Sequence, residues 1–74
     1  MTKHTDSIIA ALNCIAPGWT EGPGGLLCTS SPAGGIIDKN MAGLGWFIIF
    51  NDDRKILEGF NSRDDAVEAY LLAS

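Results

Sequence analysis

A run of five large apolar side chains, from Trp46 to Phe50, constrains this chain more than any other feature. Successive side chains of a β-strand point to opposite faces, so Trp46, Ile48 and Phe50 share one face and Phe47 and Ile49 share the other. A strand with one face in water alternates apolar and polar residues, whereas this run is apolar on both faces. The sequence therefore predicts a strand that needs apolar cover on two sides.

Three arrangements can supply that cover. One short helix can lie on each face, which closes the domain by itself. Alternatively, both helices can pack on one face while the glycine-rich loops 18–25 and 30–35 fold over the other. In the third arrangement the second face stays open as an apolar patch, and such patches mark interfaces with a partner or a second copy. The sequence leaves all three open.

The residues around the apolar run predict a β-hairpin with strands over residues 45–51 and 55–60. The connecting residues 51–54, NDDR, are typical of a turn, because Asn and Asp side chains bond the nearby backbone and tolerate left-handed geometry. This turn contains no glycine, so its length and the strand register are not fixed by the sequence.

Residues from Thr5 to Pro17 predict a first helix. Thr5 or Asp6 can cap its N-terminus by accepting from the free amides of the first turn, and Pro17 and Gly18 end it. Trp19 follows, and we expect it in the core. The apolar stripe of this helix has the spacing i, i+3, i+4, i+7 and consists of Ile8, Ala11, Leu12 and Ile15.

A second helix is predicted after the hairpin. Ser62, with Asp65 three residues later, resembles a capping box at its start. Asp64 and Asp65 then fall in the first turn, where acidic side chains complement the helix dipole. The apolar stripe consists of Ala66, Val67, Tyr70 and Leu71.

The segment between the first helix and the hairpin is rich in glycine. Residues 18–25 read as a loop and residues 26–30 as a strand, while residues 31–44 are compatible with strand or loop, with a brief strand at GIID. The order is helix, about three strands, helix. We therefore predict one α+β domain over residues 1–74 with an antiparallel sheet (α-β-β-β-α), and a frayed N-terminus at residues 1–4.

Few residues could carry chemistry. The single histidine, His4, precedes the first helix, and Cys14 and Cys28 have apolar neighbours, so we expect two reduced, buried thiols. These three residues lack the paired spacing of structural zinc sites. The sequence predicts no catalytic, metal-binding or cofactor-binding residues.

The net charge of −4 is concentrated in residues 51–74, which contain six acidic and three basic side chains. A phosphate backbone is bound by clustered Lys and Arg, and five scattered basic residues form no such cluster, so we expect no direct binding to nucleic acid. The apolar runs are far shorter than the roughly 18–20 residues that cross a bilayer, and no secretory signal is visible. We expect a cytoplasmic protein without membrane contact.

These observations favour a small acidic, non-catalytic protein that binds another protein or a second copy of itself. An accessory or inhibitor protein of bacterial, phage or plasmid origin would have this profile. The expected interface is an apolar sheet face with charged residues around it. It consists of Phe47, Ile49, Asp52, Asp53, Arg54 and Glu58.

Two alternatives belong to other functional classes. The chain could be an acidic mimic of nucleic acid that inhibits a nucleic-acid-binding enzyme, with the C-terminal carboxylates in place of phosphates. Its binding would then depend strongly on salt, unlike apolar docking. It could also be a small thiol-dependent enzyme that uses Cys14 or Cys28 with His4, and alanine at these three positions would then abolish its activity.

Overall fold

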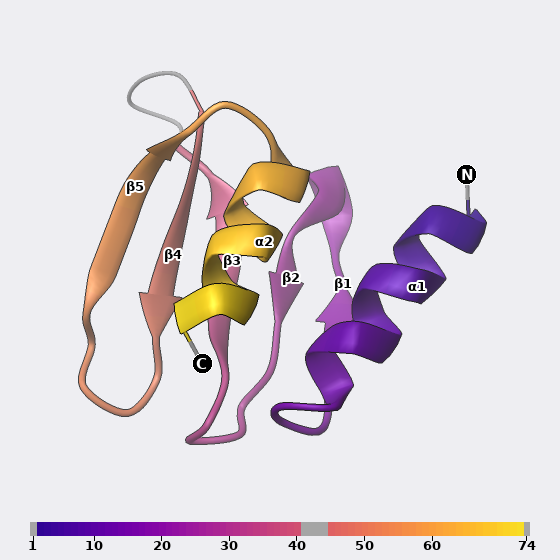
Figure 1. The fold of residues 1–74 in the computed structure, drawn as a ribbon, viewed down its shortest axis with the longest axis horizontal. Helices are drawn as coiled ribbons and strands as arrows, with labels where there is room; N and C mark the ends of the chain where they lie inside the picture. Colours follow the sequence, from indigo (N-terminus) through magenta and orange to yellow (C-terminus); the bar gives the residue numbers. More distant parts are fainter. Residues whose placement is uncertain (1, 41–44, 74) are drawn as a thin grey trace.

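Five strands form one antiparallel sheet in a computed structural model, which describes residues 2–40 and 45–73, with side chains from Ser7 onward (Figure 1). The sheet order β1-β2-β3-β4-β5 equals the chain order, so every connection joins neighbouring strands. The elements are α1 (Thr2–Asn13), β1 (Thr20–Glu21), the 3₁₀ turn η1 (Pro23–Gly25), β2 (Leu27–Cys28), β3 (Gly35–Lys39), β4 (Trp46–Phe50), β5 (Ile56–Phe60) and α2 (Arg63–Ala73).

The predicted α+β class and antiparallel sheet are confirmed, but the prediction of about three strands is wrong. The strand missed entirely is β1, which lies inside residues 18–25 and is only two residues long. A strand of that length is too short to show the alternation by which strands are recognised in a sequence. The undecided segment 31–44 contains β3, which runs through the middle of the sheet.

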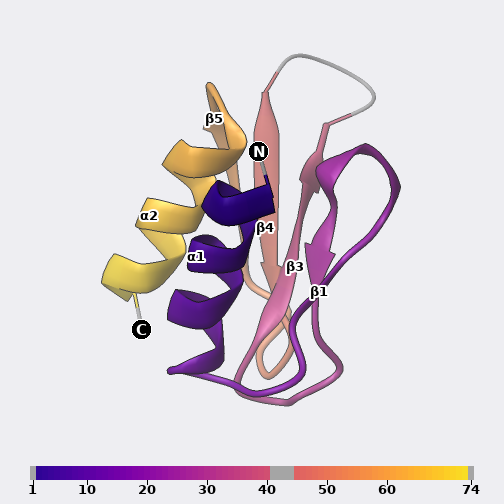
Figure 2. The same ribbon diagram turned by 90° about the vertical axis from the view of Figure 1, so that its right-hand side faces the viewer.

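Both helices lie on the same side of the sheet (Figure 2). Helix α2 packs on β3, β4 and β5. The core is the layer between the helices and this side of the sheet, and its members from the three central strands, Leu27, Ile37 and Ile48, are fully buried. The rest of the core comprises Ile8, Leu12, Trp19, Ala66, Val67 and Tyr70.

Helix α1 begins at Thr2, so the predicted start at Thr5 or Asp6 is wrong. Thr and Asp are favoured caps, but they are not obligatory, and neither proline nor glycine stands before them to stop the helix. The predicted stripe is confirmed at Ile8 and Leu12, which are buried under the sheet. The helix ends at Asn13, whose Oδ1 accepts a hydrogen bond from the Trp19 amide at 3.1 Å.

Helix α2 begins as predicted. The Ser62 hydroxyl oxygen accepts a hydrogen bond from the Asp65 amide at 3.1 Å, which satisfies one free donor of the first turn. Ala66, Val67 and Tyr70 are buried. The Tyr70 hydroxyl donates to the Ala33 carbonyl at 3.1 Å, so α2 is also tied to the connection between β2 and β3.

Three aromatic rings join the two layers. The ring of Tyr70 contacts Trp19 edge-on at 5.4 Å between centroids and stacks on Phe50 at 5.7 Å. Aromatic pairs in these two geometries add to the stabilisation from burial alone. Trp19 is therefore a core residue, as predicted.

The β4–β5 hairpin is confirmed, but the left-handed residue of its turn is Arg54 (φ 61°) and not Asn or Asp. The Arg54 amide donates to the Phe50 carbonyl at 3.0 Å, and the Lys55 amide donates to Asp53 Oδ1 at 2.9 Å. The Asp53 side chain thus stabilises the turn from the position before the left-handed residue.

A β-bulge lies at the far end of the hairpin. Trp46 pairs with Phe60 and Phe47 pairs with Glu58, so Gly59 is the additional residue, and its φ of 90° suits glycine. The bulge returns Phe60 to the helix side of the sheet, where it packs against the core together with Trp46.

Candidate interaction surface

The side of the sheet that faces away from the helices is here called the open face. Cross-strand partners share a face, and the pairings place Thr20, Cys28, Ile36, Ile49 and Ile56 in one row across all five strands. Four of these five side chains are apolar. The open face therefore carries a continuous apolar row that no described helix covers (Figure 2).

A second row of the open face mixes an aromatic ring with charge. Phe47 pairs with Asp38 on β3 and with Glu58 on β5, so a carboxylate lies on each side of the ring. Asp38 Oδ1 accepts a hydrogen bond from the Lys39 amide at 2.7 Å. This row gives the face its negative charge.

Burial separates the two faces. Ile36, Phe47 and Ile49 are half-buried, and Ile56 is 57% exposed, whereas their neighbours Ile37 and Ile48 are fully buried. The partial burial on the open face comes from mutual packing of adjacent side chains in the sheet. Of the three arrangements that the sequence allows, the structure places both helices on one face. On the other face it leaves Ile56 exposed and its apolar neighbours half-buried.

The predicted interface residues separate into groups. Phe47, Ile49 and Glu58 lie together on the open face. Asp52 and Asp53 instead line a hollow of about 190 Å³ together with Phe50, Lys55 and Ala73, at the end of α2.

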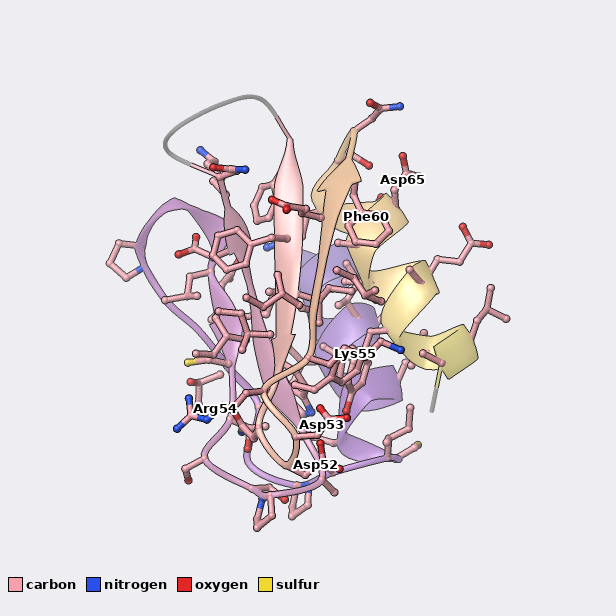
Figure 3. All side chains as sticks on the ribbon, turned by 90° about the vertical axis from the view of Figure 1, so that its left-hand side faces the viewer. Asp52, Asp53, Arg54, Lys55, Phe60 and Asp65 are labelled. Atoms are coloured by element: carbon pink, nitrogen blue, oxygen red, sulfur yellow. The ribbon has the colours of Figure 1, made fainter. Side chains whose placement is uncertain are left out.

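Arg54 and Lys55 leave the turn in opposite directions. In Figure 3, Arg54 points away from α2, toward the side of the open face, and Lys55 extends toward α2. The turn thus contributes a cation to the border of the open face, while its two aspartates belong to the helix side.

Sequence reasoning missed five members of the open face: Thr20, Cys28, Ile36, Asp38 and Ile56. Once GIIDK is taken as a strand paired with β4, alternation places Ile36 and Asp38 on the face opposite to Ile37. That alternation is the sequence signal that could have found them. Ile56 required the hairpin register, which the turn sequence leaves open.

Neither cysteine is fully buried, contrary to the prediction. Cys14 is exposed because α1 ends one residue before it, and Cys28 is half-buried on the open face. Both are free thiols. Among the side chains that the structure describes, from residue 7 to 40 and from 45 to 73, no three of His, Cys, Asp or Glu gather in a way that could hold a metal ion. None of the helices described there has the length and apolar character to cross a bilayer.

The architecture is a two-layer α+β domain in which a meander sheet has one helix-covered face and one open face. The chain matches no protein-family model, no curated protein and no solved structure. Inferences about function therefore start from the two faces of the sheet.

Proposed function

We propose that this protein acts by binding another protein through the open face. The observation that carries the proposal is the apolar row on β2, β3, β4 and β5, which lies on the side opposite both helices. Apolar side chains gathered on one surface are typical of protein interfaces. An accessory or inhibitor protein works by occupying its partner and needs no catalytic group of its own.

The size of the face fits the centre of an interface. Three of the strands are five residues long and two are two residues long. At about 3.3 Å per residue and about 4.8 Å between strands, they make a face of roughly 300 Å². A standard interface buries about 800 Å² on each partner, with an apolar centre and a polar rim. The apolar row would supply the centre, and Asp38, Glu58 and Arg54 would supply part of the rim.

The charges on the face indicate what the partner carries. Asp38 and Glu58 flank Phe47, and the whole chain has a net charge of −4. Charge complementarity would favour a partner with an apolar patch bordered by Lys or Arg. Such binding would keep most of its strength in salt, because its centre is apolar.

The test compares one substitution on each side of the molecule. Tagged wild-type protein, Phe47→Asp and Leu72→Asp are used to capture partners from a lysate of the organism that encodes the chain. Leu72 is 82% exposed at the end of α2, so Leu72→Asp adds the same charge to a surface on the helix side. Urea unfolding of all three proteins reports whether they remain folded.

We expect the wild type and Leu72→Asp to retain one stoichiometric partner and Phe47→Asp to lose it, with all three proteins folded. Retention of the partner by a folded Phe47→Asp protein would contradict the proposal. Unfolding of Phe47→Asp would also contradict it, because Phe47 would then belong to the core.

A further inference from the structure

The two edges of the sheet differ in what they offer to another chain. At one edge, β1 is two residues long, which leaves little backbone to pair with. At the other edge, β5 is five residues long and is paired only with β4. Figure 3 looks onto this edge, with β5 in front of β4 and α2 to the side. An edge strand carries unpaired N–H and C=O groups that can template a further strand.

The alternation of hydrogen-bonded and non-hydrogen-bonded residue pairs between β4 and β5 identifies the β5 backbone groups that point away from the sheet. The Phe50 amide donates to the Lys55 carbonyl at 2.9 Å, so this opposed pair is a hydrogen-bonded one. In an antiparallel ladder such pairs alternate with pairs that do not bond each other. Leu57 therefore directs its backbone groups to Ile48, whereas Ile56 and Glu58 direct theirs away from the sheet.

Side chains on this edge favour a cationic occupant. Ile56 is 57% exposed, Glu58 is exposed, and both lie on the open face. Asp65 stands beside the end of β5 near Phe60 (Figure 3). Lys55, the basic residue nearest to Ile56 and Glu58 in the sequence, extends toward α2 (Figure 3). Arg63 is engaged on the other side of the molecule, where its Nη1 lies 2.7 Å from Glu21 Oε2.

We propose that β5 accepts an extended, basic segment of a partner protein as a sixth strand. The outward N–H and C=O groups of Ile56 and Glu58 would bond its backbone. A Lys or Arg would stand opposite Glu58, and an apolar residue would stand opposite Ile56. Strand addition of this kind takes its affinity from main-chain bonds and its specificity from alternate side chains. The inference goes beyond the proposed function, because the edge can bind a peptide even when the open face binds nothing.

A second copy of the chain is the less favoured occupant. Pairing β5 with itself would bring together two C-terminal segments that each contain six acidic and three basic side chains. Like charges on adjacent strands destabilise the pairing. The bulge at Gly59 limits the straight part of the edge to Ile56–Glu58. Pairing of two copies would therefore form few main-chain hydrogen bonds to offset the repulsion between their acidic side chains.

The test is an NMR titration of the ¹⁵N-labelled full chain with two synthetic peptides. The probe is acetyl-Lys-Thr-Val-Thr-Lys-amide, and the matched control is acetyl-Glu-Thr-Val-Thr-Glu-amide. We expect the amide signals of Ile56 and Glu58 to shift most, and the lysine peptide to bind at least about fivefold more tightly than the glutamate peptide. Glu58→Lys should reverse this preference without altering the backbone.

Two further variants separate the edge from the open face. Ile56→Pro removes an outward N–H without removing a bond to β4, because proline is tolerated on an edge strand where the N–H faces solvent. This variant should bind the lysine peptide at least about fivefold more weakly, while Ile56→Thr and Phe47→Asp retain binding. Thermal unfolding checks that the Ile56→Pro protein is folded. If it is unfolded, the Glu58→Lys protein still tests whether the charge of Glu58 sets the preference for the lysine peptide.

Several outcomes would overturn the inference. Equal binding of both peptides to the wild type, or no shift at Ile56 and Glu58, would show that the edge is not a basic-peptide site. A solution mass of two chains that Ile56→Pro reduces to one would assign the edge to a second copy. The capture experiment with Phe47→Asp tests the open face, and the peptide titration tests the edge strand. Because each result can fail without the other, failure of the proposed function and failure of this inference are distinguishable.

Discussion

Ile48 and Ile49 are neighbours in β4 with identical side chains, yet they lie in different environments. Ile48 is fully buried beneath the helices, and Ile49 is half-buried on the open face. The same contrast holds for Ile37 and Ile36 on β3. Apolar character on both sides of a strand therefore does not make both sides core. The side on which the two helices pack decides which residues stabilise the fold and which are left accessible.

The largest expected difference between the two faces is in how much stability is lost when an isoleucine side chain is shortened to alanine. Ile37→Ala should lower the free energy of unfolding by about 2–5 kcal/mol, because it removes contacts and leaves a cavity in the core. Ile36→Ala, the same change one residue away, should cost about 1 kcal/mol or less, because part of the side chain is already in water. Urea unfolding of both variants measures the difference, and equal costs would show that the two faces are equally covered.

A smaller difference between the two faces is expected when one hydroxyl group is removed or added. Tyr70→Phe should cost about 1 kcal/mol, because the Ala33 carbonyl loses the hydroxyl that donates to it. Phe47→Tyr makes the reverse change on the open face and should leave stability within about 0.5 kcal/mol of the wild type. A thermal unfolding series reports both changes. A larger penalty for Phe47→Tyr than for Tyr70→Phe would place the Phe47 ring in a closed environment.

The smallest expected effect concerns the ion pair between α2 and β1. The side chains of Arg63 and Glu21 are 17% and 38% exposed, so solvent screens their attraction. Arg63→Gln should cost about 0.2–1 kcal/mol and less at high salt. Arg54→Gln removes the same charge from the exposed turn and serves as the control. An Arg63→Gln penalty well above this range would mean that the pair is essential for closing the helix-covered face.

Features set by local sequence could be predicted. The Ser62 cap depends on residues three apart, and the hairpin depends on strand signals on either side of NDDR, so both were found. The α1 stripe at Ile8 and Leu12 was found for the same reason. The missed strand β1 has no local signal, because two residues form a strand only through their pairing with β2.

The candidate site depended on tertiary features that the sequence does not encode locally. Alternation assigned Phe47 and Ile49 to one face, but it could not say which face the helices cover. Asp52 and Asp53 were grouped with Phe47 because they are close in the chain, whereas the turn places them in the hollow beside Ala73. Ile36 and Asp38 joined the site only once β3 was paired with β4.

The central claim is that one face of the sheet is core and the other is accessible. The most direct test replaces Ile48 and Ile49 separately by Asp and records the unfolding transition of each protein. A buried, unpaired carboxylate costs far more than an accessible one, so Ile48→Asp should be unfolded and Ile49→Asp should keep a cooperative transition. If Ile49→Asp unfolds as completely as Ile48→Asp, the open face is part of the core and the account is wrong.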